Sequence, residues 1–293
     1  MALQGLIVKA TGGFYYVEAR GCVYECRARG LFRKEGLTPY VGDHVTVDPT
    51  EEGKGYVVEI APRKNSLIRP PMANIDRLAV IVSAHEPEPN VFVTDKLLTI
   101  AERREIEPII IITKTDLGDW QEFAQIYEQG GFTVLPTSTA TEEGVQAVRE
   151  LLCQGITALS GNSGVGKSSL LNAIAPGLTL PTAEISKHLG RGRHTTRHVE
   201  LFHLGEGYVA DTPGFSSVEL DQFERMLAPE LELLFREFAP YLGKCRFTGC
   251  AHLCEKGCAV LDAVGQGLIH PSRHKSYVAL YEQLRDVRQW QLK

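Results

Sequence analysis

Short runs of alternating hydrophobic and polar residues fill the first part of the chain, up to about residue 65. The runs are Leu6–Lys9, Phe14–Glu18, Val23–Arg27, Asp43–Val47 and Tyr56–Ile60. Turns that contain glycine, such as residues 11–13 and 52–55, separate them. Short strands with such turns predict a small all-β barrel, and their number fits a five-stranded barrel of the oligonucleotide-binding (OB) type.

From about residue 73 the pattern changes to buried strands that alternate with amphipathic helices. Strands are expected at Leu78–Ser83, Ile109–Ile112, Phe132–Leu135 and Ile156–Leu159, and helices at Val93–Ile106, Trp120–Glu128, Val145–Leu152 and Ser169–Ile174. Val199–Leu204 and Tyr208–Asp211 are expected to form a hairpin. This alternation predicts a mostly parallel sheet with helices on both faces.

Two further segments complete the expected organisation. Residues 61–72, with the adjacent prolines Pro70 and Pro71, are expected to be an extended linker. After the sheet, Leu220–Tyr241 is expected to be helical with a break near Pro229, and residues 271–292 to form a closing helix. We therefore expect a barrel domain at 1–68, an α/β domain at 69–218 and a helical domain at 219–293.

Composition limits the classes of partner. The 293-residue chain is 43% hydrophobic and has a formal net charge of −5, so any contact with nucleic acid must come from local basic patches. No run approaches the roughly 18 apolar residues of a membrane span, so no membrane contact is expected. One basic patch lies on the barrel, where Arg27, Arg29, Arg33 and Lys34 accompany Tyr15, Tyr16 and Tyr24. These residues fit an RNA-contacting face and a solvated loop beside ordinary strand tyrosines equally well.

The strongest chemical signal follows the expected strand at 156–159. Gly161, Asn162, Ser163, Gly164, Val165, Gly166, Lys167 and Ser168 match the P-loop pattern G-x-x-x-x-G-K-[ST] at every fixed position. Ser169 continues into the expected helix. The glycines let backbone N–H groups form an anion-binding nest at a helix N-terminus. Lys167 is expected to reach the β- and γ-phosphates of a nucleotide, and Ser168 to hold Mg²⁺.

A second phosphate motif lies further along the chain. Asp211 and Gly214 form a DxxG at the end of an expected strand, where the aspartate helps to hold Mg²⁺ and the glycine N–H meets the γ-phosphate. Between the two motifs, Thr195 or Thr196 is well placed to complete the Mg²⁺ coordination from a switch loop.

The expected base-reading residues precede the P-loop, although they follow it in most GTPases. Thr113, Lys114, Thr115 and Asp116 follow one buried strand, and Ser138 and Thr139 follow the next. Asp116 is expected to pair with two guanine nitrogens. The order of motifs is therefore rotated, which a sheet tolerates because relocating chain termini to exposed loops leaves the packing unchanged.

With these motifs the chain resembles a known family, the circularly permuted, ribosome small-subunit-dependent GTPases of bacteria (the RsgA type). The resemblance covers nearly the whole chain and rests on the permuted order, the barrel, residues 192–196 (GRHTT) and a C-terminal cysteine cluster. It implies a cytoplasmic monomer that hydrolyses GTP to GDP and phosphate. It also implies binding to the small (30S) subunit and its 16S rRNA in late assembly, with stimulation by the subunit. Thr113 stands where the family most often has Asn, which leaves guanine selectivity to Asp116 and suggests modest affinity.

The resemblance also suggests a catalytic residue. Many GTPases place a glutamine after the DxxG to orient the attacking water, but this chain has Phe215 there. The family suggests that His194 takes this role, beside Lys167 and the threonines Thr195 and Thr196. The alternative is that His194 only packs or binds RNA. Without the glutamine, the isolated protein is expected to hydrolyse GTP slowly.

The cysteines indicate a metal site. Four of the seven cysteines lie within residues 245–258, which favours a metal in a reducing compartment over disulfides. Cys245, Cys250, His252 and Cys258 form a closed Cys₃His set typical of structural zinc, and they match the zinc knuckle of the same family. Cys254 is a rival ligand. Nearby basic residues fit RNA contact, namely Lys244, Arg246, Lys256, Arg273, His274 and Lys275.

Two other functions fit parts of the sequence. A P-loop ATPase or kinase that binds RNA would keep the P-loop, but Asp116 after Thr113 and Lys114 argues against it. An RNA-binding module with a vestigial nucleotide site is the other alternative. The intact Lys167, Ser168 and Asp211 argue against that one.

Overall fold

The computed structural model describes residues 2–30, 32, 36–51, 53–175, 199–212, 226–288 and 290. Its contacts divide the chain into two compact units. The first comprises Met1–Leu78, Arg149–Ser160 and Lys167–Phe215, and the second comprises Ala79–Val148, Gly161–Gly166 and Ser216–Lys293. Within the described residues, no helix has the length and apolar character needed to cross a membrane. The domain boundaries expected from the sequence stay predictions.

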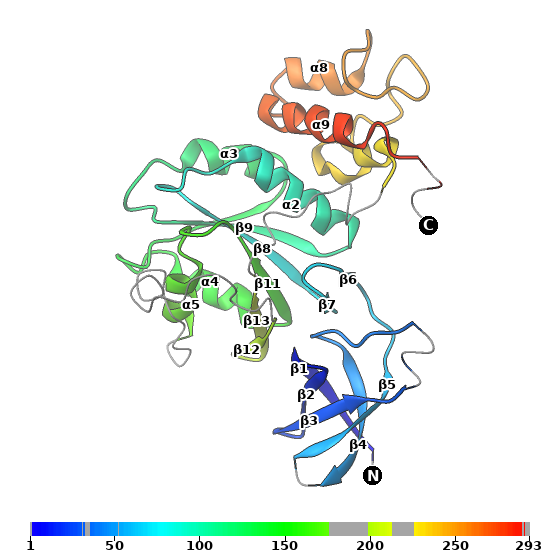
Figure 1. The fold of residues 1–293 in the computed structure, drawn as a ribbon. Coiled ribbons are helices and arrows are strands. Elements are labelled where there is room, and N and C mark those ends of the chain that lie inside the picture. The colour runs from blue at the N-terminus through cyan, green and yellow to red at the C-terminus, as the bar shows by residue number, and fades with distance from the viewer. Residues whose placement is uncertain are drawn as a thin grey trace. The chain divides into compact units, whose positions relative to one another are not determined.

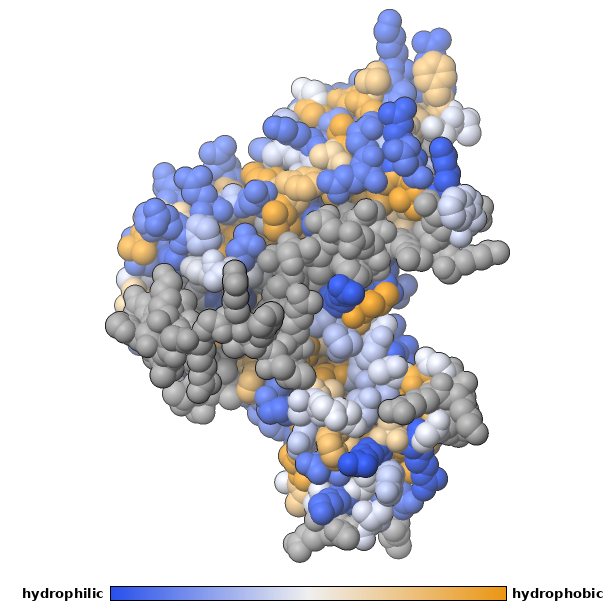
Figure 2. Space-filling model, viewed as in Figure 1, coloured by the Kyte–Doolittle hydropathy of each residue, from blue (hydrophilic) through white to orange (hydrophobic). Residues whose placement is uncertain are grey.

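The N-terminal strands close into the expected barrel, drawn in blue in Figure 1. Its strands are β1 (Leu3–Thr11), β2 (Phe14–Ala19), β3 (Cys22–Ala28), β4 (His44–Glu51) and β5 (Lys54–Ile60). The order around the barrel is β1-β2-β3-β5-β4, and β4 pairs back with β1. Alternate residues such as Ile7, Val17, Val47 and Val57 are completely buried, so the period-two pattern fills the barrel interior. On the face seen in Figure 2 the barrel surface mixes hydrophilic and hydrophobic residues.

The expected linker at 61–72 is not wholly extended. It contains a two-stranded sheet of β6 (Ser66–Leu67) and β7 (Met72–Ala73). Pro70 and Pro71 lie in the turn between these strands, where a missing N–H costs no ladder hydrogen bond. Leu67 and Met72 are buried, so the hairpin contributes to the core of the first unit.

The central sheet confirms the predicted α/β pattern. Its strands are β8 (Arg77–Ser83), β9 (Glu107–Thr113), β10 (Thr133–Pro136), β11 (Ile156–Ser160), β12 (Leu201–Leu204) and β13 (Gly207–Asp211). They are ordered β10-β9-β8-β11-β13-β12. The pairs β10–β9 and β11–β13 are parallel, whereas β12 is antiparallel to β13 as the expected hairpin requires.

The helices of this region lie close to their predicted positions. They are α2 (Val91–Arg103), α3 (Gln121–Gln129), α4 (Val145–Leu152) and α5 (Lys167–Ile174). Asn90 caps α2, because its side chain accepts a hydrogen bond from the Val93 N–H at 3.1 Å. The structure thus confirms the type and order of these elements.

The C-terminal region differs in detail from the prediction. The expected helix at 220–241 lies partly outside the described residues. Its described part forms the 3₁₀ segments η2 (Ala228–Leu234) and η3 (Arg236–Phe238), separated by the extended residue Phe235. The helix α8 (Ala259–Gly265) was not predicted, and α9 (Pro271–Leu284) ends before residue 292. In Figure 1, α9 lies over α2, and the two helices are in contact.

A buried ion cluster joins α9 to α2 and η3 within the second unit. The Arg273 guanidinium contacts the Asp95 Oδ1 at 2.5 Å and the Glu237 Oε1 at 2.6 Å. Burial alone lowers the pKa of Arg273, but these carboxylates outweigh it, and the pKa is raised. Burial raises the pKa of Asp95, and Arg273 partly offsets that effect. Arg273 was expected to be an RNA contact, but it is 1% exposed and serves the core instead.

In the first unit, the barrel contacts the β12–β13 hairpin. Lys9 of β1 forms a β-bridge and a 2.8 Å ion pair with Glu200, which precedes β12. Glu18 of β2 lies 2.8 Å from the His203 Nε2 and accepts a hydrogen bond from the Tyr208 hydroxyl at 3.3 Å. Polar contacts from β1 and β2 therefore reach one edge of the central sheet.

Candidate nucleotide and metal sites

Three glycines shape the P-loop. Gly164 and Gly166 have φ values of +85° and +92°, which L side chains rarely adopt. A Cβ at Gly161 would lie 2.4 Å from the Ile81 carbonyl oxygen, so the loop passes too close to β8 for any side chain there. The residues between them, Asn162 and Ser163, are exposed, and Val165 is buried. The sequence pattern therefore corresponds to a backbone shape that only glycine supports.

The predicted base-reading loop is tied directly to the P-loop. Thr113, at the end of β9, lies with its Oγ1 2.5 Å from the Val165 carbonyl oxygen and 3.0 Å from that of Val82. Lys114 donates from its Nζ to the Gly164 carbonyl oxygen at 2.9 Å and to the Glu86 carbonyl oxygen. Lys114 itself has a φ of +56°. The structure thus brings two motifs together that lie about 50 residues apart in sequence.

Asp116 and Ser138 are also brought together. The Ser138 hydroxyl donates to the Asp116 Oδ1 at 2.6 Å. The same Ser138 oxygen accepts hydrogen bonds from the N–H groups of Ala140 and Thr141, both at 3.2 Å. Ser138 is buried, whereas Asp116 and Thr139 are exposed and Thr115 is half-buried. A fixed, solvent-facing carboxylate of this kind suits recognition of two adjacent N–H donors on a planar base.

Lys167 and Asp211, two further residues predicted to bind nucleotide and Mg²⁺, both belong to the first unit. Asp211 ends β13, and it pairs in register with Leu159 of β11, the strand that leads into the P-loop. Burial lowers the pKa of Lys167 and raises the pKa of Asp211, and each charge partly offsets the shift of the other. The Asp211 Oδ1 is buried without a hydrogen-bond partner among the described residues. A buried carboxylate oxygen with no protein partner fits a site that receives Mg²⁺ or its water.

Of the remaining predicted residues, some lie at the start of α5 and others lie outside the described residues. Ser168 is half-buried and Ser169 exposed at the start of α5. His194, Thr195, Thr196 and Gly214 lie outside the described residues, as does Phe215. Their predicted roles stay predictions.

The cysteine cluster forms as predicted. Ligand atoms of Cys245, Cys250, His252 and Cys258 all lie within 4.8 Å of one another, and Cys254 is exposed and outside the group. The Cys245 and Cys258 sulfurs are 3.8 Å apart, and the His252 Nδ1 lies 3.5 Å and 3.3 Å from them. A tetrahedral Zn²⁺ with ordinary bond lengths requires about 3.8 Å between sulfurs and about 3.6 Å between sulfur and nitrogen. The donor set and its spacing therefore fit zinc.

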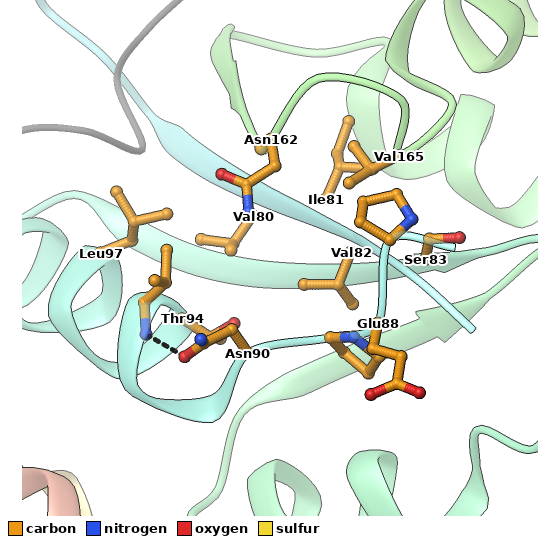
Figure 3. A pocket seen from close by; sticks show the side chains of 14 residues that line it. Val80, Ile81, Val82, Ser83, Glu88, Asn90, Thr94, Leu97, Asn162 and Val165 are labelled. Carbon is orange, nitrogen blue, oxygen red and sulfur yellow. Dashed lines mark hydrogen bonds between the residues drawn. The ribbon is translucent and has the colours of Figure 1, made fainter. Parts of the chain in front are cut away.

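A small pocket adjoins the P-loop on the α2 side (Figure 3). It lies between the end of β8, the first turns of α2 and the loop residues Gly161, Asn162 and Val165. Val80, Val82 and Leu97 give it an apolar wall. None of residues 113–116 lines it, so it is distinct from the base-reading loop.

Sequence reasoning missed two groups of polar residues. Asp95, Glu237 and Arg273 hold the C-terminal module on α2, and the only sequence signal was a lone aspartate on the apolar face of a helix. Glu232 contacts the predicted zinc ligand His252 at 2.9 Å, and no spacing rule connects residues that lie 20 positions apart.

Comparisons with known proteins agree across nearly the whole chain. The family model described as "RsgA N-terminal domain" matches residues 4–57, and the one described as "RsgA GTPase" matches residues 60–221. A protein of Geobacillus sp. (strain WCH70), described as small ribosomal subunit biogenesis GTPase RsgA, is 46% identical over 97% of this chain and 98% of its own. A protein of Shouchella clausii with the same description is 46% identical over the same shares.

Solved structures give the same result. The crystal structure of YloQ, described as a circularly permuted GTPase, is 37% identical with a TM-score of 0.80, and the match covers 98% of this chain and 96% of YloQ. YjeQ from Thermotoga maritima is 35% identical with a TM-score of 0.83, and the match covers 98% and 100% of the two chains.

Proposed function

This chain belongs to the RsgA family of circularly permuted GTPases, and we propose that it serves in biogenesis of the small ribosomal subunit. Its relatives are described by that role. Binding to the 30S subunit and its 16S rRNA, and stimulation of GTP hydrolysis by the subunit, form part of the proposal. The protein acts as a monomer in the cytoplasm.

The observation that carries the nucleotide site is the contact of Thr113 and Lys114 with P-loop carbonyl oxygens. These bonds fix the base-reading loop relative to the loop that holds the phosphates. Asp116 then reads the guanine N1–H and N2–H₂ groups, and Ser138 and Thr139 border the base. Adenine lacks the N1–H and N2–H₂ groups from which this carboxylate would accept hydrogen bonds. A carboxylate in this position therefore favours GTP over ATP.

The remaining groups handle the phosphates and the metal. Backbone N–H groups of 161–166 and the N-terminus of α5 bind the β- and γ-phosphates, and Lys167 adds a positive charge. Ser168, Thr195 or Thr196, and Asp211 hold Mg²⁺, which neutralises charge on the phosphates. The Gly214 N–H meets the γ-phosphate, and His194 orients the attacking water.

The barrel and the C-terminal module contact RNA. A groove on the barrel is lined by residues that include Phe14, Tyr15, Arg27 and Arg29, and the Arg27 guanidinium lies 4.7 Å from the centre of the Phe14 ring. Arg29 pairs with Asp48 at 2.9 Å in an exposed ion pair. A phosphate of RNA can take the place of the Asp48 carboxylate beside Arg29. In the metal-binding loop, Phe247 is 52% exposed beside Arg246. Exposed aromatic and basic residues together suit unpaired bases and phosphates.

The deciding experiment measures GTP hydrolysis with and without purified small subunits, in wild type and in His194→Ala. The wild type should be slow alone and faster with subunits, because contact with the subunit is expected to align the catalytic group with the attacking water. His194→Ala should lower the stimulated rate by roughly 10²–10⁴-fold and leave subunit binding nearly unchanged. If His194→Ala is stimulated normally, or if it only loses subunit binding, His194 does not orient the attacking water. Absence of stimulation in the wild type rejects the ribosomal role.

A further inference from the structure

We infer that Glu232 orients the zinc ligand His252 and thereby ties the metal to segment η2, which packs on helix α2. The inference rests on the zinc assignment for the Cys₃His cluster. It concerns a residue outside the ligand set, on the segment that precedes the metal-binding loop.

The two nitrogens of the His252 ring face different partners. Nδ1 points to the sulfurs, 3.5 Å from Cys245 and 3.3 Å from Cys258. Nε2 lies 2.9 Å from the Glu232 Oε2. A neutral imidazole carries one N–H and one lone pair, so a carboxylate at Nε2 keeps the hydrogen there and leaves the Nδ1 lone pair for the metal. A carboxylate behind a ligating histidine also makes that histidine a better donor.

The His252 ring, which contacts Glu232, is buried, and the His252 backbone contacts α9. The His252 side chain is 3% exposed, whereas that of Glu232 is 32% exposed, so the ring is sheltered and the carboxylate is partly exposed to solvent. His252 has a φ of +58°, and its carbonyl oxygen is 2.7 Å from the His274 Nε2. A side chain of α9 thus contacts the backbone of His252. The ring itself neighbours the Phe238 and Tyr277 rings, and its Nε2 contacts Glu232.

Segment η2, which carries Glu232, is itself in contact with helix α2. Glu230, two residues before Glu232, pairs with Arg103 of α2 at 3.3 Å. Leu231 between them is buried, and η2 contacts both α2 and α9. The metal, His252, Glu232 and η2 therefore form a continuous set of contacts that ends on α2.

The test measures zinc affinity of the full-length protein by competition with a chromophoric chelator. Glu232→Ala should weaken zinc binding by about 10–100-fold, the usual effect of losing a carboxylate behind a ligating histidine. Glu232→Gln, which keeps an acceptor but no charge, should fall in between. The control is Glu282→Ala, which removes an exposed carboxylate of α9 that pairs with Arg285 and touches no ligand, and it should leave zinc affinity unchanged.

A second measurement separates orientation from loss of a ligand. With Co²⁺ in place of zinc, Glu232→Ala should keep the absorption bands of a tetrahedral thiolate site, whereas Cys245→Ser should change them. Wild-type zinc affinity in Glu232→Ala, or an equal loss in Glu282→Ala, overturns the inference but leaves the zinc assignment intact. A wild-type chain that takes up no zinc overturns the zinc assignment and the role of Glu232 together.

Discussion

The Thr113 hydroxyl lies 2.5 Å from the carbonyl oxygen of Val165, across 52 positions of the sequence. The Thr113 hydroxyl oxygen is also 3.0 Å from the carbonyl oxygen of Val82. A hydroxyl has a single hydrogen, so it serves these two acceptors in turn. Thr113 is 3% exposed, and water therefore cannot replace the bond. One buried hydrogen bond thus links the base-reading loop to the P-loop.

Thr113→Val should weaken GDP and GTP binding to a similar extent. The change keeps the shape but removes the hydroxyl that donates to the Val165 and Val82 carbonyl oxygens. The loss should cost about 1–3 kcal/mol, or roughly 5- to 150-fold in affinity where the cost falls on the bound state. Thr113→Ser retains the hydroxyl and is the control. Titration with a fluorescent GDP analogue measures both, and equal affinity in the valine variant would contradict the linking role.

Asp116→Asn should shift preference from GTP to xanthosine triphosphate. The carboxylate accepts from guanine N1–H and N2–H₂, whereas an amide can donate to the xanthine carbonyl. Competition between the two nucleotides measures the shift. Ser138→Ala, which removes the 2.6 Å bond to Asp116, should weaken GTP binding without reversing the preference. Unchanged preference in Asp116→Asn means that residues 113–116 do not read the base.

Nucleotide affinity should fall as pH rises through the lowered pKa of Lys167. Burial favours the neutral amine in the free protein, and bound phosphates favour the ammonium, so binding takes up a proton above that pKa. Calorimetry in buffers of different ionisation enthalpy measures the uptake. Lys167→Ala, compared at each pH, subtracts the titration of the guanine base itself. A wild type and variant with parallel pH profiles would exclude Lys167 as the source.

Purified protein should contain one zinc per chain. Cys245→Ser should release the metal and loosen the C-terminal module, because a structural zinc contributes folding free energy. Cys254→Ser is the matched control and should keep the zinc, since Cys254 is exposed and outside the cluster. Metal analysis and thermal unfolding give the two readouts, and zinc loss in Cys254→Ser would assign the ligand set differently.

Arg273→Met should destabilise the protein by about 3–5 kcal/mol, because it leaves the buried carboxylates of Asp95 and Glu237 without their cationic partner. The control is Arg285→Met, which breaks the exposed pair with Glu282 and should cost at most about 1 kcal/mol. Denaturant unfolding measures the difference. Similar values for the two variants would mean that the buried cluster adds nothing specific.

Sequence patterns predicted the elements that local periodicity controls. The barrel strands and α4 illustrate this, because alternating or helically spaced apolar residues determine which face is buried. Prediction failed where local signals are short or mixed. Helix α8 has only seven residues, and in η2 a proline at the start precedes 3₁₀ rather than α geometry. The hairpin of β6 and β7 has strands of two residues, too short for any periodicity.

The candidate site also has features that the sequence predicted and features that it did not. Glycine and lysine spacing was enough to locate the P-loop, since the backbone shape depends on those residue types. The bonds from Thr113 to Val165 and from His252 to Glu232 join distant segments, and only the folded chain shows them. Charge alone misled at Arg273, where a basic residue at a helix start is buried among acids and aromatic rings.

Among the described strands, β12 lies at the end of the central sheet and has a strand partner on one side only. Strand edges of this kind can pair with other chains and begin aggregation. Here the barrel reaches the hairpin through the bridge of Lys9 to Glu200 and the contact of Glu18 with His203. The barrel thus occupies part of this strand edge. We expect a chain shortened to begin after the barrel to expose β12 to pairing with a second copy.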